Sequence, residues 1–322
     1  MKGPRVPDLG VAIVTWNAQD VIQACLDSLF ADADGLSLQV VVVDNASTDD
    51  TVELVERGYP QVTLIANAEN RGFAAANNQA LPLLDAPYLM LLNPDTVVHS
   101  GALRTLSRYL EEHPAIGAVG PKVVHPAMRL RVLSCGYQPS VRTVINQYAG
   151  LSRLFPERPA FRGVNLLMGL HDDRPREVEW LSGVCLMVRR SVVESVGLLS
   201  ERWFMYAEDM EWSYRMREAG WDLYHVPQAV IEHHLGHCAA KNARVSTMWV
   251  TSQRSFYRER ENASWLQQHA FDAALAAGLL VRSLLYGLRG LLGGKAADMW
   301  RGECRRFWAY AGAALEPLRS DA

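Results

Sequence analysis

The chain lacks the sequence patterns of several protein classes. Its five cysteines are odd in number, lie far apart and include no C-x-x-C pair, which argues against a disulfide framework and for reduced thiols in the cytosol. No apolar segment precedes the first predicted strand, so no signal peptide is expected. The formal net charge is -3, and no dense run of Lys and Arg is interleaved with aromatic residues. Nucleic acid is therefore not an expected partner.

Two common phosphate-binding motifs are missing as well. Where a dinucleotide-binding protein has G-x-G-x-x-G after its first strand, this chain has Thr15-Trp16-Asn17-Ala18. No Walker-type loop occurs either. Nicotinamide binding and P-loop chemistry are therefore not expected.

A long uninterrupted apolar run is also absent, because Arg282 and Arg289 interrupt the longest one. A spanning helix needs about 20 predominantly apolar residues, so we expect an amphipathic helix instead, with the two arginines opposite its apolar face. That face carries Leu280, Leu284, Leu288 and Leu291. Packing on the rest of the protein, contact with a second copy, and in-plane contact with a membrane, favoured by Lys295 and the arginines, remain open.

What the chain does have is the composition of a globular protein, with 49% hydrophobic and 21% charged residues over 322 positions. Short apolar runs alternate with amphipathic segments from Gly10 to about Gly120. The predicted strands are 11–14, 40–43, 62–65 and 88–92, and the predicted helices are 21–30 and 51–57. This alternation predicts an α/β protein with a mostly parallel central sheet flanked by helices.

The pattern weakens between Val124 and Pro175, where the sequence indicates only a variable insertion or lid. Order returns from Val178 to Val226. The elements predicted there are a strand at 184–188, a helix at 210–219 and a strand at 221–226.

Polar side chains follow the predicted strands and should converge at one edge of the sheet, where ligands bind in open α/β folds. Asp44 follows a run of four valines and could accept a base N–H or ribose hydroxyls. Ser47 and Asp49 could simply cap the next helix. Asp95, in Asn93-Pro94-Asp95, could coordinate a hard divalent cation on a diphosphate, although a lone Asp in a turn is also a common structural feature.

An acidic pair and a histidine cluster lie later in the chain. Glu208 and Asp209 open a predicted helix, where they could supply a catalytic base or merely complement the helix dipole. His233 lies within a short segment that also contains His234, His237 and Cys238. An imidazole from this segment could reach a cation held by Asp95; a structural zinc site is the alternative, but it normally needs a second ligand pair from a spaced motif.

Seven motifs, in this order along the chain, resemble the inverting nucleotide-sugar glycosyltransferases of family 2, most closely their rhamnosyltransferase-like branch. They are V-T-W-N at 14–17, V-D-N-A-S-T-D at 43–49, N-R-G-F-A at 70–74, L-N-P-D at 92–95, W-L-S-G at 180–183, F-M-Y-A-E-D at 204–209 and H-x-x-G at 233–236. Each motif alone is weak, but seven in the family's order make a specific pattern.

The resemblance implies a GT-A fold with C-terminal amphipathic helices. It implies a flexible tail at 1–9, a glycosyltransferase domain at 10–262 and a helical extension at 263–322. Residues 10–120 would form the nucleotide-binding half, and residues 121–262 the acceptor-binding and catalytic half.

The resemblance also implies roles for individual residues. The expected nucleotide and donor ligands are Thr15, Asn17, Asp44, Asn45, Ser47, Asn70, Arg71, Gly72 and Asn93. Asp95 and His233 would hold Mg²⁺ or Mn²⁺ on the diphosphate, and Trp180 and Gly183 would line the acceptor or sugar pocket. Asp209, with Glu208 beside it, matches the base that removes the acceptor hydroxyl proton.

The implied activity is transfer of a sugar, L-rhamnose from dTDP-L-rhamnose, to a glycan or lipid-linked acceptor, in the cytoplasm or peripherally at the inner face of the cytoplasmic membrane. A sugar nucleotidyltransferase and a non-catalytic nucleotide-sugar-binding protein are the alternatives. The chain departs from the family pattern in three places: Leu199-Ser200-Glu201 replaces Phe-Asp-Glu, Cys238 replaces a serine, and Ala80 replaces a glycine. These departures leave the donor open, the segment from Val124 to Pro175 leaves the acceptor open, and the C-terminal helices leave the oligomeric state open.

Overall fold

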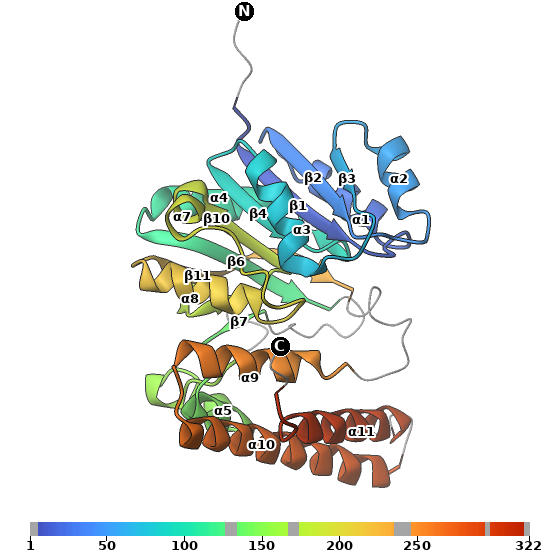
Figure 1. Ribbon diagram of the computed structural model, residues 1–322. Helices are drawn as coiled ribbons and strands as arrows, with labels where there is room; N and C mark the ends of the chain where they lie inside the picture. Colours follow the sequence, from blue (N-terminus) through green and yellow to red (C-terminus); the bar gives the residue numbers. More distant parts are fainter. Residues whose placement is uncertain (1–5, 126–133, 167–173, 235–245, 294–296, 319–322) are drawn as a thin grey trace, which may run out of the picture. The chain divides into compact units, whose positions relative to one another are not determined.

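The computed structural model describes residues 6–125, 134–166, 174–234, 246–293 and 297–318 (Figure 1). The chain forms two compact units. The first unit spans residues 1–135, 169–204 and 208–242, and the second spans 136–168, 205–207 and 243–322. The first contains the large sheet, and the second is helical.

The strands of the chain are β1 (Leu9–Thr15), β2 (Leu38–Asp44), β3 (Thr63–Ala66), β4 (Tyr88–Leu92), β5 (Thr96–Val98), β6 (Ile116–Val124), β7 (Cys135–Gly136), β8 (Arg176–Val178), β9 (Trp180–Leu181), β10 (Cys185–Arg189) and β11 (Asp222–His233). The helices of the first unit are α1 (Ile22–Ala31), α2 (Thr51–Gly58), α3 (Gly72–Ala80), α4 (Ala102–Glu112), α7 (Arg190–Val196), α8 (Glu208–Glu218) and the short 3-10 helix η1 (Leu81–Leu83). Every strand and helix predicted from the sequence in this unit is present, with ends that differ by a few residues except at β11, which continues to His233.

The strand order of the large sheet is β3-β2-β1-β4-β10-β6-β11-β5, with β8 paired to β11. Strands β3, β2, β1 and β4 are parallel to one another, as β6 is to β11, whereas β10 runs antiparallel to both of its neighbours. This α/β architecture confirms the predicted fold class. The antiparallel β10 matters for the site, because it brings its N-terminal end beside the carboxyl end of β4.

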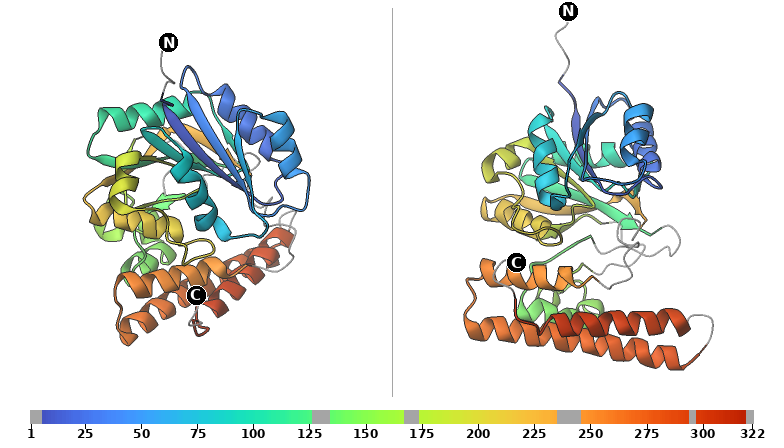
Figure 2. Two further views of the ribbon diagram at one scale, coloured as in Figure 1. Left: turned by 45° about the horizontal axis from the view of Figure 1, so that its top comes forward. Right: turned by 45° about the vertical axis from the view of Figure 1, so that its right-hand side comes forward.

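The apolar runs become strands because both faces of the sheet are covered. All four valines of the run Val40–Val43 are almost fully buried. Alternate side chains of β1 and β2, such as Val11 and Val40, join a core with helices α1 and α4. The intervening side chains face the other side of the sheet, where α3 contacts β1 and β2 (Figure 2).

The second unit contains α5 (Val141–Tyr148), α6 (Leu151–Leu154), η2 (Pro159–Phe161), α9 (Met248–Arg260), α10 (Trp265–Leu291) and α11 (Ala297–Ala313). Its core includes Tyr257 stacked on Phe271, with ring centroids 4.1 Å apart. Gly278 lets α10 approach α5 closely, because a Cβ there would lie 2.3 Å from the Tyr148 ring. Ala, Leu and Gly in this region therefore form a packed helical unit.

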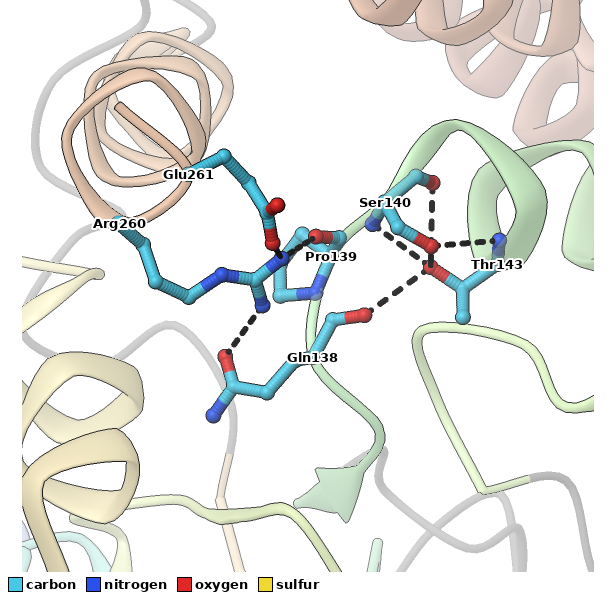
Figure 3. A network of polar contacts seen from close by, with 6 residues as sticks. All are labelled: Gln138, Pro139, Ser140, Thr143, Arg260 and Glu261. Carbon is cyan, nitrogen blue, oxygen red and sulfur yellow. Dashed lines mark hydrogen bonds and ion pairs between the residues drawn. The ribbon is translucent and has the colours of Figure 1, made fainter. Parts of the chain in front are cut away.

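Polar contacts join α9 to the start of α5 (Figure 3). Arg260 donates to the Pro139 carbonyl at 2.9 Å and to Gln138 Oε1 at 3.3 Å, and it forms an ion pair with Glu261. Ser140 and Thr143 form a reciprocal capping box at the first turn of α5. The segment for which the sequence predicted only an insertion or lid thus contributes helices to the second unit.

Helix α10 corrects one expectation from the sequence. At 27 residues, it is long and apolar enough to cross a membrane, judged by length and composition alone. The expectation that no segment reaches this length was wrong because the helix contains only three charged residues, Asp272, Arg282 and Arg289, among its many alanines and leucines. In this structure, one face of α10 is buried in the core of the second unit.

Candidate active site

The sheet register aligns the carboxyl ends of β1, β2 and β4. Thr15 is opposite Asp44, and Ile13 is opposite Leu92. The residues that follow these strands therefore lie along one edge of the sheet in the first unit. This is the convergence predicted from the sequence.

Asp44 is buried and organises the loop that follows β2. Its Oδ1 accepts hydrogen bonds from the hydroxyls of Thr15, at 2.8 Å, and Ser47. Its Oδ2 accepts from the backbone N–H of Ser47 at 2.8 Å. A carboxylate offers about four acceptor positions, so these three bonds leave room for one hydrogen bond from a ligand.

Asn17 joins the loop after β1 to the loop after β2. Its backbone N–H donates to Ser47 Oγ at 2.8 Å, and its Oδ1 accepts from the Thr48 N–H at 2.8 Å. Asn17 has a φ of 51°, a left-handed conformation that asparagine tolerates better than most residues. Ser47 thus links Asp44 and Asn17 and does not cap α2, whose N-cap residue Asp50 makes no side-chain capping bond.

Asn45 connects the same loop to the segment before α3. Its Nδ2 donates to the Gly72 carbonyl at 3.0 Å, and its Oδ1 accepts from Asn67 Nδ2 at 3.0 Å and from the Arg71 N–H at 3.5 Å. Asn70 Oδ1 accepts from the Gly72 N–H at 3.0 Å. The sequence reasoning missed Asn67, although it directly follows β3 and the rule used for the other strands would have found it.

Gly72 and the next residue bring α3 against the segment that precedes α8. Gly72 has a φ of 82°, and a Cβ there would lie 2.8 Å from the Phe204 carbonyl oxygen. The Phe73 N–H donates to that same oxygen at 3.0 Å. The Phe73 ring reaches Gly183, where an added Cβ would lie 2.8 Å from two ring carbons. Both glycines are therefore required by close approach.

The loop after β4 lies between β10 and the end of β11. The Asn93 N–H donates to the Val184 carbonyl at 2.9 Å, and the Asn93 carbonyl accepts from the Thr96 hydroxyl at 2.7 Å. Asp95 and His233 are both buried, with 3.0 Å between Asp95 Oδ1 and His233 Nε2. The pairing of Thr96 with His233 in β5 and β11 holds these two side chains together.

The Asp95–His233 pair fits part of a divalent-cation site. Mg²⁺ is commonly held by one or two carboxylates, with phosphate oxygens and water completing its coordination. Buried His233 Nδ1 has no hydrogen-bond partner among the described residues. No group of three or more His, Cys, Asp or Glu side chains suited to a metal occurs in the described part of the chain. The other residues of the zinc alternative, His237 and Cys238, and the motif glycine Gly236 lie outside the described residues.

Asp209 lies in the first turn of α8 and is half-buried. Its Oδ2 accepts from the Gly183 N–H at 3.1 Å, and its Oδ1 accepts from the Met210 N–H at 2.8 Å. Burial raises the pKa of Asp209 above its ordinary value, and these bonds, with one from the Ser182 hydroxyl, act in the opposite direction. A carboxylate with a raised pKa is a stronger base.

The neighbouring acids differ from Asp209. Glu208 is buried at the start of α8. Glu211 is paired with Arg215, at 2.6 Å between Oε1 and Nε. Trp180 is buried in β9, and the next residue, Leu181, donates its N–H to Ser213 Oγ at 3.2 Å.

One series of contacts connects these groups within the first unit. From Asp44, it passes through Asn45 to Gly72, and from Phe73 to Gly183 and Asp209. From Gly183, the chain continues to Val184, whose carbonyl accepts a hydrogen bond from the loop carrying Asp95.

The sequence analysis also missed Asn78. Its side-chain amide is hydrogen-bonded to both backbone groups of Leu199, at 2.9 and 3.0 Å. These bonds fix the segment where the family's Phe-Asp-Glu is replaced.

Comparisons with known proteins identify relatives of this chain. The family model described as "Glycosyl transferase family 2" matches residues 10–147. An N-acetylglucosaminyl-diphospho-decaprenol L-rhamnosyltransferase of Mycobacterium tuberculosis is 30% identical over 301 residues, which cover 86% of this chain and 94% of the relative. A low-salt glycan biosynthesis hexosyltransferase of Haloferax volcanii is 26% identical over 218 residues, which cover 65% of this chain and 62% of the relative.

Solved structures with the same fold include proteins bound to nucleotide sugars. A Pyrobaculum calidifontis mannosyltransferase in complex with GDP-Man and Mn²⁺ has a TM-score of 0.57 at 19% identity, with 97% of this chain and 88% of that chain covered. Residues 1–349 of Staphylococcus aureus TarS in complex with UDP-GlcNAc have a TM-score of 0.53 at 18% identity, with coverages of 97% and 82%. These likenesses confirm the predicted GT-A fold.

Proposed function

Because this chain belongs to glycosyltransferase family 2, with a rhamnosyltransferase among its relatives, we propose that it transfers L-rhamnose from dTDP-L-rhamnose to a lipid-linked glycan acceptor. The glycosyltransferase activity follows from the family. The donor and acceptor are inferred from the relative, whose name specifies L-rhamnose transfer to a diphospho-decaprenol-linked sugar. The buried contact series that ends at Asp209 is the observation that carries the proposal in this chain.

Asp209 is the base in this mechanism. It accepts the proton of the acceptor hydroxyl while that oxygen attacks the anomeric carbon from the face opposite the leaving diphosphate. One displacement of this kind inverts the anomeric configuration. The bonds from Gly183 and Met210 orient the carboxylate, and burial raises its pKa, so that it remains a competent base. Such a base contributes about 10²- to 10⁴-fold to the rate. Glu208, buried beside Asp209 at the start of α8, is the second catalytic candidate.

The donor nucleotide lies, in this proposal, along the loops after β1 and β2. Asp44 has one acceptor position left for a base N–H or a ribose hydroxyl, and its neighbours hold it in place. Asn70, Arg71, Gly72 and Asn93 are proposed to lie near the donor, with Asn70 and Gly72 held in place by the bond between them. The residues proposed to bind the nucleotide, which this network holds in place, are Thr15, Asn17, Asp44, Asn45 and Ser47.

Asp95 and His233 are proposed to hold Mg²⁺ or Mn²⁺. When bound, such an ion neutralises the charge that develops on the leaving diphosphate. The 3.0 Å separation and joint burial of the two side chains support this role, as does the Mn²⁺ in the mannosyltransferase of the same fold. Trp180 and Gly183 are proposed to border the acceptor or sugar pocket.

The domain roles follow from these assignments. We assign the donor to the half at residues 10–120, and the acceptor and base to residues 121–262, with 263–322 as a helical extension. We also place the enzyme on the cytoplasmic side of the membrane, where nucleotide sugars are made and a lipid-linked acceptor could be reached.

A donor panel tests the proposal. The full chain is incubated with dTDP-L-rhamnose, UDP-galactose, UDP-N-acetylglucosamine or GDP-mannose, with Mg²⁺ or Mn²⁺ and a polyprenyl-diphosphate-linked N-acetylglucosamine. Release of dTDP, with a rhamnosylated product of inverted configuration, is expected. Release from another donor would overturn the rhamnose assignment. Formation of a nucleotide sugar from a sugar phosphate would favour the nucleotidyltransferase, and binding without turnover would favour the non-catalytic protein.

A further inference from the structure

Helix α10 exposes an almost entirely apolar face along its whole length. Of its exposed residues, only Gln267, His269 and Arg289 are polar. The face, called here the α10 apolar face, consists of Leu266, Ala270, Ala273, Ala277, Val281, Leu284, Leu285, Leu288, Leu291 and the C-cap residue Leu292. The six residues from Val281 onward are between 48% and 87% exposed.

The spacing of these residues shows that they form one stripe. They recur at intervals of three and four residues, which is the repeat of a single helix face. A helix on the surface of a monomeric protein normally carries polar residues there, and a continuous exposed apolar patch marks an interaction site. The stripe runs along 27 residues, a length of about 40 Å at 1.5 Å per residue.

The opposite face of α10 is already occupied by protein. Phe271, Leu275 and Leu279 are buried in the core of the second unit. Asp272 pairs with buried Arg254, which donates to both carboxylate oxygens at 2.7 Å and also to the Ala313 carbonyl. Leaving this unit to span a bilayer would expose these groups to hydrocarbon, which is costly. The partner must therefore lie alongside the helix.

Arg289 is exposed on α10 directly after Leu288, and further arginines lie on α10 and on α11, which packs against it. Arg282 lies over the rings of Tyr148 and Phe307, and Arg289 lies over Trp300 at 5.2 Å. Arg301, Arg305 and Arg306 are exposed on α11. The described residues between 281 and 306 carry five arginines against two carboxylates. Apolar side chains with arginines nearby suit an anionic lipid surface, with the helix lying in the plane of the membrane.

We propose that the α10 apolar face docks on the surface of an anionic phospholipid bilayer, with its leucines among the acyl chains and the arginines of α10 and α11 at the headgroups. A second copy of the chain fits less well, because two faces that carry the same excess of arginine would meet. Docking involves no sugar transfer, so its test is independent of the proposed function.

Vesicle co-sedimentation of the full chain tests the proposal. Wild-type protein is mixed, without donor or acceptor, with vesicles of phosphatidylcholine alone or with added phosphatidylglycerol. We expect binding to the anionic vesicles that weakens as salt increases. A Leu284→Glu/Leu288→Glu variant should lose at least about tenfold in partitioning, because charged groups enter the acyl region poorly.

The matched control is Leu83→Glu, at a leucine of η1 in the first unit that is 49% exposed. It should bind within about twofold of wild type. Circular dichroism and thermal melting check that all variants are folded. Light scattering gives the oligomeric state without lipid.

Three results would overturn the proposal. One is the absence of wild-type binding to anionic vesicles, or equal binding by the double variant. Another is a stable dimer, without vesicle binding, that the double variant dissociates, which would assign the face to a second copy. The third is resistance of cell-membrane-bound protein to both high salt and alkaline carbonate, which would indicate a spanning helix.

Discussion

Two regions of the molecule place side chains in unfavourable surroundings. One is the sheet edge of the first unit, and the other is the α10 apolar face of the second unit. At the sheet edge, polar groups such as Asp44, Asn45 and Asp95 are buried. On α10, leucines such as Leu288 and Leu291 are exposed. Burying a polar group is costly unless it is hydrogen-bonded, and exposing an apolar patch is costly unless something covers it.

The two regions differ in what offsets the free-energy cost of these surroundings. The polar groups of the sheet edge largely satisfy one another, which holds them in fixed positions before any ligand binds. Fixed dipoles and charges are what a catalytic site requires. The leucines of the α10 apolar face are exposed among the described residues, and we propose that a membrane surface covers them. The side chains of the first region are thus held mainly by one another, whereas the leucines of the second are exposed.

The largest expected effect concerns the base. Asp209→Asn should lower the rate of sugar transfer by at least about a hundredfold, because the amide cannot accept the acceptor proton, while donor binding is retained. Transfer is measured as release of the nucleoside diphosphate, and donor affinity by calorimetry. Glu211→Gln is the matched control, since Glu211 is paired with Arg215. Near-normal transfer by Asp209→Asn would exclude Asp209 as the base.

Removing the metal ligands should abolish metal-dependent binding of the nucleotide. For Asp95→Ala and His233→Ala, we expect dTDP with Mn²⁺ to give no more thermal stabilisation than dTDP with EDTA, because the ion no longer has its protein ligands. The control is His234→Ala, at the adjacent imidazole, which should keep the Mn²⁺ effect. An undiminished Mn²⁺ effect in Asp95→Ala would remove Asp95 from the metal site.

The contact between Phe73 and Gly183 should affect kcat more than KM. Phe73→Ala removes the ring that packs against the glycine whose N–H bonds Asp209, so the base is less well positioned. Small displacements of catalytic groups cost roughly ten- to a hundredfold. Phe73→Leu, which retains bulk at this position, should recover most of the activity. Equal loss by both variants, or a change confined to KM, would contradict this role.

The smallest expected effect is a shift of the pH profile. Because the pKa of Asp209 is raised, the acid limb of kcat/KM should lie above the ordinary aspartate value of about 3.9, and activity should fall as the pH decreases through it. Ser182→Ala removes a hydrogen bond that stabilises the carboxylate, so the limb should move to higher pH. A shift to lower pH would be inconsistent with this hydrogen bond.

The same assays test whether the sheet edge and the α10 apolar face act independently. Leu284→Glu/Leu288→Glu should leave dTDP release with a water-soluble acceptor within about twofold of wild type, because surface changes away from a site have small effects. Asp209→Asn, conversely, should leave vesicle binding unchanged. If either variant affects both readouts, the two regions are not independent.

Local chemistry was enough for the sequence to predict the main strands and three helices of the first unit, and the edge of the sheet at which its polar residues gather. Apolar runs such as Val40–Val43 become strands, and the polar residues after them lie at the same edge because parallel strands end there together. Asn67 follows the same rule, and it was missed because the rule was not applied to the strand that it follows. The residues themselves suggested roles for Asp44, Asp95 and Asp209, the family resemblance made those roles specific and added Thr15, and all four roles stay predictions.

Only the tertiary structure showed which residues from distant segments contact one another. The pairing of Asp95 with His233, the contact of Phe73 with Gly183, and the role of Ser47 as a link to Asp44 each join residues whose proximity depends on the packing or loop conformation. The sequence of α10 likewise gave an apolar face and two arginines, but not which side the protein covers. A helical repeat fixes which residues share a face, whereas the elements packed around the helix decide whether that face is buried or exposed.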